Sequence, residues 1–234
     1  MNFENTLVHL DSIRDSEIAR YKRHLTRMKP STPEDIFRRW LFAYASVHTT
    51  WKLNCKLYYA LRGLEWLGDK EALKRNIVGA RAGFHNRRAD YIYDFSQYYW
   101  EHPDWFRKSK HENWYDYRNR IERSAKGIGH AKGAFVVEMT YPLEAQVVCV
   151  DTHILQMYGF TPAEISNPGV KRQDLNTVEK HWVTCCNIRG VPPTLARWLY
   201  WDRKQGHSDS RYWSYLFEEE DYYVRLAKIA SSSE

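Results

Sequence analysis

The sequence is poor in cysteine, and this shortage excludes several classes of protein. Only four of the 234 residues are cysteines, and two of them are adjacent: Cys55, Cys149, Cys185 and Cys186. Four cysteines do not make a disulfide-held scaffold in a chain of this length. Their spacing also matches neither a zinc site nor an iron–sulfur cluster. We therefore expect a protein of a reducing compartment with no bound metal.

Long apolar runs and a signal peptide are missing as well. No apolar run approaches the roughly 18 residues that a membrane-spanning helix needs. The first residues, Met1–Asn5, lack the charged and apolar regions of a secretory signal. Internal repeats and low-complexity linkers are also missing from the sequence. The sequence therefore predicts a cytoplasmic protein that does not contact a membrane.

Aromatic residues and positive charge are abundant instead. Hydrophobic residues make up 43% of the chain and aromatic residues 15%, with 10 tryptophans and 17 tyrosines. This is enough material for a buried core. The formal net charge is +6 and the isoelectric point is near 9.0. A basic balance is a weak indication of partners that carry phosphate, and it equally fits a basic protein without such a partner.

Apolar residues recur at helical spacing through most of the chain, which predicts an all-α fold of about ten helices. The segment 146–150 is apolar and β-branched and is expected to be extended, but it is too short for a sheet. Capping patterns mark two helix starts, at Thr32-Pro33 with Asp35 and at Thr161-Pro162 with Glu164. We expect one domain over residues 1–234, with two lobes. The predicted helices cover residues 3–28, 36–45, 51–67, 70–77, 86–99, 114–123, 130–139, 151–158, 176–186, 193–203 and 212–230.

The strongest local pattern is a hairpin between two predicted helices, over residues 114–140. Gly127 and Gly129 permit a tight turn with positive φ and leave backbone N–H groups uncovered at the start of the second helix. Such N–H groups and the helix dipole suit a phosphate. A Gly-x-Gly pair alone is also common in ordinary turns between helices. The candidate phosphate-binding residues are Lys126, Gly127, Ile128, Gly129, His130 and Lys132.

A wider pattern resembles a known family. The stretch from Lys126 to Val137, followed by Cys149 to Ile154, resembles the helix-hairpin-helix (HhH-GPD) superfamily of DNA glycosylases, which includes endonuclease III and the 8-oxoguanine DNA glycosylases. The segments 46–50 and 83–89 resemble two further family segments. The resemblance covers residues 35–160. It implies a two-lobed helical fold and an enzyme that acts on double-stranded DNA.

The resemblance implies that Asp151, in the segment 146–158, is the essential aspartate. A carboxylate near the sugar stabilises the positive charge that develops when a base–sugar bond breaks, or activates the attacking nucleophile. Asp151 also suits the N-cap of the following helix, and one residue can fill both roles. Lyase members carry a lysine where this chain has Ala131. Lys132 remains a catalytic candidate, but a shift of one residue rotates a helix position by about 100°. We therefore expect Lys132 to point elsewhere and the enzyme to be monofunctional.

Other site residues are less sharply marked. His48, Asn86 and His153 are candidates for the base pocket or for the wedge that fills the gap left by a flipped base. A histidine in such a place is also often a structural hydrogen-bonding group. Several basic residues suit a phosphate track: Arg87, Arg88, Arg118, Arg120, Arg123 and Lys126. The acidic run 218–221 argues against DNA contact there.

Two alternatives to base excision stay open. Some phage proteins with glycosylase-like folds, the α-glutamyl/putrescinyl thymine pyrophosphorylases or amino acid:DNA transferases, resemble this chain in their size and their Lys-Gly-Ile-Gly core. In such a transferase Asp151 would assist an amine nucleophile. A non-catalytic module would use the hairpin only to hold DNA. In each case we expect a monomer in a bacterium or a phage-infected host, with no cofactor other than a monovalent cation at the hairpin.

Overall fold

The computed structural model describes residues 1–166, 169–204 and 217. Over these residues the chain is helical and contains no strand, so the segment 146–150 is not part of a sheet. The predicted helix 212–230 and the acidic run 218–221 lie outside the described residues. The helices are α1 (Glu4–Asp11), α2 (Asp15–Met28), α3 (Pro33–Ala45), α4 (Trp51–Leu61), α5 (Lys70–Gly79), α6 (His85–Glu101), the 3-10 helix η1 (Pro103–Phe106), α7 (Trp114–Ser124), α8 (His130–Thr140), α9 (Thr152–Met157), α10 (Pro162–Ser166), α11 (Arg172–Ile188) and α12 (Pro193–Lys204).

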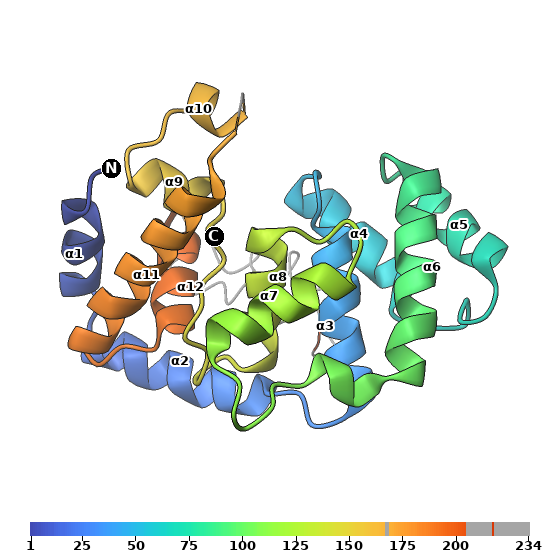
Figure 1. Cartoon of the computed structure of the whole chain (residues 1–234), viewed down its shortest axis with the longest axis horizontal. Coiled ribbons are helices and arrows are strands. Elements are labelled where there is room, and N and C mark those ends of the chain that lie inside the picture. Colours follow the sequence, from blue (N-terminus) through green and yellow to red (C-terminus); the bar gives the residue numbers. More distant parts are fainter. Residues whose placement is uncertain (167–168, 205–216, 218–234) are drawn as a thin grey trace, which may run out of the picture.

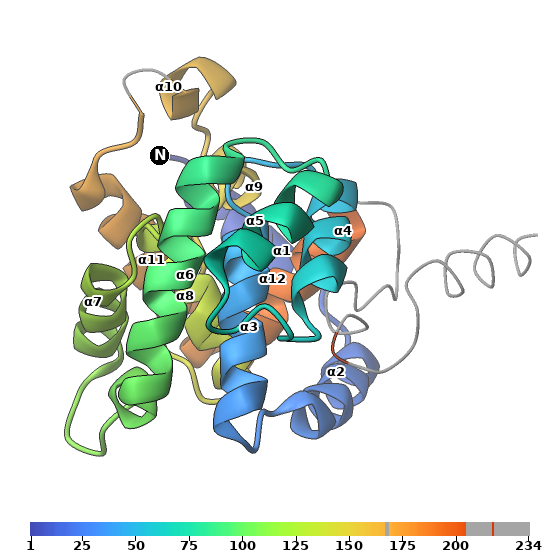
Figure 2. The ribbon, with the colours of Figure 1, turned by 90° about the vertical axis from the view of Figure 1, so that its right-hand side faces the viewer.

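The helices form two lobes (Figure 1). One lobe is built from helices near the beginning of the chain and helices late in it. In this lobe α1 packs on α11, and α12 packs on α11 and α2. The other lobe contains α3 to α6, with α3 packed on α4, α6 and α8. Figure 2 turns this second lobe toward the viewer. The hairpin formed by α7 and α8 lies at the centre of Figure 1, between the two groups of helices. The all-α, two-lobed prediction is confirmed.

Side chains with a strong capping tendency begin several helices. The hydroxyl of Thr32 accepts the backbone N–H of Asp35, and the Asp35 carboxylate accepts the N–H of Thr32. Thr161 and Glu164 make the same reciprocal pair before α10. Each pair satisfies N–H groups that the first turn of a helix leaves without a helical acceptor. Both capping predictions from the sequence are therefore confirmed.

The long N-terminal helix expected over residues 3–28 is wrong, because the chain forms two helices there. The hydroxyl of Ser12 donates to the carbonyl of His9 and thereby ends α1 with a local side-chain bond. The carboxylate of Glu17 then accepts the N–H of Arg14 and starts α2. The apolar periodicity continues through the break, so periodicity alone does not reveal it.

Aromatic side chains fill the core of the second lobe. Trp40 lies 4.8 Å from Phe95 and 5.4 Å from Phe106, measured between ring centroids, and all three rings are buried. These edge-to-face and tilted contacts are the arrangements that aromatic rings prefer. Much of the aromatic excess in the sequence is therefore structural. No helix among the described residues is both long enough and apolar enough to cross a membrane.

Candidate active site

A cavity lies between the two lobes and contains Asp151. The second lobe contributes residues of α3 and α4, the hairpin contributes α8, and the first lobe contributes α12. Five of its twelve lining residues carry aromatic rings, and polar and charged residues lie among them. The lining residues are Phe42, Ser46, Trp51, Asn54, Lys132, Phe135, Cys149, Asp151, Arg197, Trp198, Trp201 and Asp202.

Asp151 is held by both carboxylate oxygens. Its Oδ1 accepts the backbone N–H groups of His153 and Ile154, each at 3.0 Å, and so caps α9. Its Oδ2 accepts Nη1 of Arg197 at 3.1 Å. The Asp151 side chain is 23% exposed, so it reaches the cavity while it remains hydrogen-bonded. The predicted capping role is confirmed, and the geometry leaves the carboxylate facing the cavity.

Arg197 connects Asp151 to a fully buried carboxylate on α8. Its Nε and Nη2 donate to Glu138 at distances of 2.6–2.9 Å. Burial alone would lower the pKa of Arg197, but the charges of Glu138 and Asp151 outweigh it and raise that pKa. The guanidinium is therefore a permanent cation between two acidic groups. Sequence reasoning missed both Arg197 and Glu138, which lie far from the hairpin motif in the chain.

Lys132 lines the same cavity as Asp151, and the expectation that it points elsewhere is wrong. On α8 it lies one turn before Phe135, which also lines the cavity, and its Nζ is 5.4 Å from the centre of that ring. Positions three apart on a helix share a face. The long side chain of lysine also reaches beyond its own helix position. The one-residue shift therefore does not exclude Lys132 from the site.

The hairpin has the unpaired backbone N–H groups that a phosphate site requires, although only one of its glycines uses positive φ. Gly127 has φ +83°, and a Cβ there would lie 2.4 Å from Cδ2 of Tyr91. Gly129 has φ −97°, and a Cβ there would meet nothing within 4 Å. The N–H groups of His130, Ala131 and Lys132 have no acceptor within the described part of the chain.

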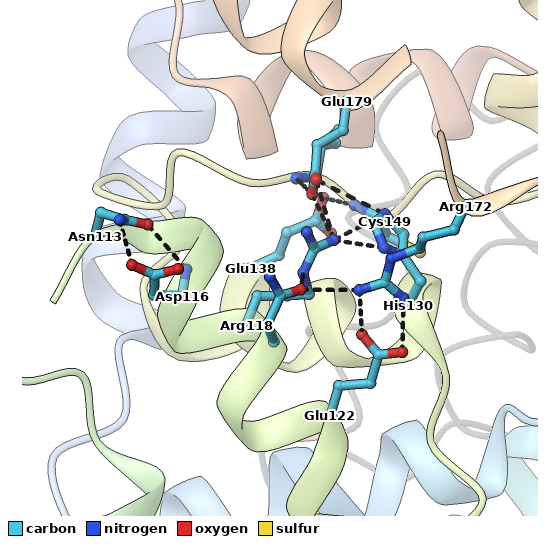
Figure 3. A network of polar contacts seen from close by, with 11 residues as sticks. Asn113, Asp116, Arg118, Glu122, His130, Glu138, Cys149, Arg172 and Glu179 are labelled. Carbon is cyan, nitrogen blue, oxygen red and sulfur yellow. Dashed lines mark hydrogen bonds and ion pairs between the residues drawn. The ribbon is translucent and has the colours of Figure 1, made fainter. Parts of the chain in front are cut away.

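Two predicted phosphate-binding side chains are buried instead. Ile128 is part of the core. The ring of His130 lies 2.7 Å from Nη1 of Arg118, measured to Nδ1, and 3.7 Å from Glu179 (Figure 3). Burial and the charge of Arg118 lower the pKa of His130 to about 3, so the ring stays neutral. Only the backbone N–H of His130 remains available to a phosphate.

The predicted arginine track is divided in the same way. Arg88 donates to the carbonyls of Tyr44 and Val47 and is a structural clamp. Arg118 is buried against Glu179, and Arg120 forms an ion pair with Glu112. Internal carbonyls and carboxylates therefore use these three cations. The exposed members of the set are Arg87, Arg123 and Lys126.

A second cavity lies beside the hairpin. His48 lines it, with φ +49°, and so does Phe84, with φ +57° at the start of α6. The Phe84 side chain is 68% exposed, which is unusual for a large apolar ring. Sequence reasoning included Phe84 only as a member of the segment 83–89 and assigned it no role. Its apolar character next to Arg87 was the available signal. Asn86 and His153 line neither this cavity nor that of Asp151, so the geometry does not place them in a base pocket.

Comparisons with known proteins place the fold. The chain is similar to the crystal structure of the 8-oxoguanine DNA glycosylase of Thermotoga maritima, with a TM-score of 0.69 and 18% identity over 89% of this chain and 100% of that chain. The chain has the fold of this DNA glycosylase. It is also similar to an 8-oxoguanine glycosylase/lyase of Methanocaldococcus jannaschii in complex with a 15mer DNA containing 8-oxoguanine, with a TM-score of 0.65, 17% identity, and coverage of 88% and 98%.

The likeness is confined to three-dimensional structure. No protein-family model and no curated sequence matches the chain. The shared fold extends over nearly the whole length of those proteins. It does not extend to residue roles, which depend on the geometry of this chain's own cavity.

Proposed function

We propose that the protein is a DNA base-excision enzyme that hydrolyses the bond between deoxyribose and a damaged or modified base. The observation that carries the proposal is the cavity itself, in which the Asp151 carboxylate faces a wall of aromatic rings. The names of the structural neighbours, which are 8-oxoguanine DNA glycosylases, support the same reaction class. Double-stranded DNA is accordingly the proposed partner.

The aromatic wall suits a base that has left the duplex. Trp51, Trp198 and Trp201 come from both lobes and line the cavity together. Rings stack on the π-face of any base, typically with about 1–3 kcal/mol per base. Stacking on these rings compensates for the stacking that a base loses when it is flipped out of the duplex. The sugar of such a nucleotide would lie toward Asp151 and Lys132, which line the same cavity.

The Asp151 carboxylate supplies the charge that the reaction needs. Breaking the base–sugar bond builds positive charge on the sugar, and the Asp151 carboxylate stabilises that charge from a fixed position. The unpaired N–H groups at the start of α8 would bind a backbone phosphate and fix the position of the DNA without reading its sequence. Phe84 and His48, beside the hairpin, are the proposed residues that fill the gap left in the duplex.

A second candidate, a glycosylase that also cleaves the DNA strand, is favoured by the position of Lys132. A primary amine in the cavity of Asp151 can attack C1′ of the sugar and displace the base, and opening of the sugar ring then gives a Schiff base. Borohydride reduces a Schiff base to a stable bond. Treatment during the reaction therefore distinguishes the two candidates: hydrolysis leaves the protein free, and lyase chemistry links it to DNA through Lys132.

The test of the proposed function is base release from duplex oligonucleotides that each carry one modified base. We expect wild type to leave abasic sites, and Asp151→Asn to slow the single-turnover rate by about 100-fold or more. Asparagine is also a good N-cap residue, so this variant removes the charge and keeps the cap of α9. If Asp151→Asn binds DNA as tightly as wild type does, the lower single-turnover rate reflects the chemical step and not weaker binding.

Three other outcomes would contradict the proposal. Binding of DNA without release of any tested base would favour a non-catalytic module. Transfer of an amine to pyrophosphate-activated 5-hydroxymethyl bases, without base release, would favour the transferase. Equal base release by wild type and Asp151→Asn would remove Asp151 from the reaction.

A further inference from the structure

Two buried glutamates hold the segment that precedes Asp151, one from each side. Glu179 on α11 accepts the backbone N–H of Val148 at 3.1 Å. Glu138 on α8 accepts the next N–H, that of Cys149, at 2.9 Å (Figure 3). Both carboxylates are completely buried. The extended segment therefore obtains its hydrogen bonds from side chains instead of from a neighbouring strand.

Each glutamate forms an ion pair with a buried arginine. Glu179 lies 3.0 Å from Nη1 of Arg118, and Glu138 lies 2.6 Å from Nη2 of Arg197. The two pairs thus have the same composition, similar burial, and one bond each to the same segment. They differ in their further contacts: Arg197 also contacts Asp151, whereas Arg118 and Glu179 also contact the ring of His130.

The fork of the guanidinium explains why an arginine occupies this place. Nε and Nη2 of Arg197 contact Glu138, and this leaves Nη1 to donate to Oδ2 of Asp151. The planar group has its donors in fixed directions, whereas a lysine ammonium is a single point charge. Since the backbone N–H groups of α9 hold Oδ1, the contact of Arg197 with Oδ2 fixes the second oxygen.

We infer that Arg197, anchored by Glu138, is a positioning residue that holds the Asp151 carboxylate in one orientation toward the cavity. The catalytic consequence of this inference rests on the proposed function, but the positioning itself does not. Without Arg197 only the capping contacts hold the carboxylate. Whenever these contacts break, the carboxylate can rotate about the Cα–Cβ bond of Asp151. A misplaced catalytic group loses rate even when the substrate binds as before.

The test compares two double variants that each remove one complete ion pair. Arg197→Met with Glu138→Leu removes the pair that contacts Asp151, and Arg118→Met with Glu179→Leu removes the matched pair that does not. Replacing both members of a buried pair by apolar residues is often tolerated, whereas removing one member leaves a buried charge. Each double variant also takes one hydrogen-bond acceptor from the segment, so loosening of the segment affects both alike.

We expect the Arg197/Glu138 variant to excise a base roughly 10- to 100-fold more slowly in single turnover, with unchanged DNA affinity. Hydrogen exchange at the capped N–H groups of His153 and Ile154 should be faster in this variant only. The Arg118/Glu179 variant should keep the wild-type rate and exchange. Equal rate losses in the two double variants, or wild-type rates in both, would overturn the inference.

The exchange measurement separates this inference from the proposed function. If wild type releases no base from any duplex, the proposed function fails, and the exchange of the His153 and Ile154 amides alone decides whether Arg197 positions Asp151. If the Arg197/Glu138 variant does not fold, Arg197→Lys serves in its place. It keeps a charge beside Glu138 but lacks the fork. Slower excision and faster exchange in Arg197→Lys would support the inference, and wild-type values of both would overturn it.

Discussion

Replacing Gly127 by alanine tests whether the geometry of the hairpin depends on a glycine at this position. At φ +83° an alanine costs about 1–2 kcal/mol relative to a right-handed conformation. Its Cβ would also lie 2.4 Å from the ring of Tyr91, so the ring must move. Overpacking of this kind typically costs about 1–3 kcal/mol. We therefore expect Gly127→Ala to lower the free energy of unfolding by about 2–5 kcal/mol.

Gly129→Ala is the matched control, two residues further along. Its φ is −97°, and the added Cβ meets nothing within 4 Å. An alanine in place of glycine at an N-cap costs less than about 1 kcal/mol. The added methyl group would nevertheless stand beside the exposed N–H groups of α8. We therefore expect weaker DNA binding with little change in stability.

Urea unfolding followed by circular dichroism measures the first effect, and fluorescence anisotropy with a duplex that contains an abasic-site analogue measures the second. A further variant, Gly127→Ala with Tyr91→Ala, removes the overlap and should recover part of the lost stability. Equal stability of Gly127→Ala and wild type would refute the reasoning about the turn. Full DNA affinity in Gly129→Ala would refute the reasoning about the phosphate site.

Three further predictions concern other parts of the molecule. Phe84→Ala should leave stability within about 0.5 kcal/mol of wild type, because the ring is exposed. The same variant should bind duplexes with a flipped base more weakly. Equal affinity of Phe84→Ala and wild type would exclude Phe84 as a wedge. Burial lowers the pKa of His9 to about 4 in the folded protein, so proton binding at His9 should account for about 3 kcal/mol of the stability that is lost between pH 6.5 and pH 4. This loss should shrink in His9→Gln and persist in the exposed-site control His111→Gln, as measured by urea unfolding at each pH. Burial raises the pKa of the Cys149 thiol to about 12, so a thiol reagent should modify Cys149 only after unfolding, and rapid labelling of the native protein would contradict this.

The sequence predicted local features well because neighbouring residues determine them. Thr32 and Asp35 are three residues apart, so their reciprocal cap follows from spacing alone. The N-cap role of Asp151 and the positive φ of Gly127 are local in the same sense. The all-α class followed from helical periodicity, which tertiary packing then reinforced.

Contacts between distant segments could not be predicted in this way. Arg197 lies 46 residues from Asp151 and 59 residues from Glu138 in the chain, and no motif connects them. The sequence likewise does not distinguish Arg118, which is buried, from Arg123, which is exposed. Whether a charge lies inside depends on which helix packs over it. Lys132 shows the same limit. Its helix position is rotated by about 100° from that of Ala131, but its long side chain still reaches the cavity of Asp151.

The contacts of the α1 region with α12, the last described helix, have a consequence for synthesis of the protein on the ribosome. The ring of His9 contacts the carbonyl of Ala196, a separation of 187 residues, and Arg203 contacts Ser12 across 191 residues. These contacts of His9 and Ser12 can therefore form only after nearly all of the described chain has emerged from the ribosome. The lobe of α3 to α6 can assemble earlier from nearby segments. Since Arg197 lies on α12, the charge cluster around Asp151 is completed only after this helix has been synthesised, when the hairpin can already have formed.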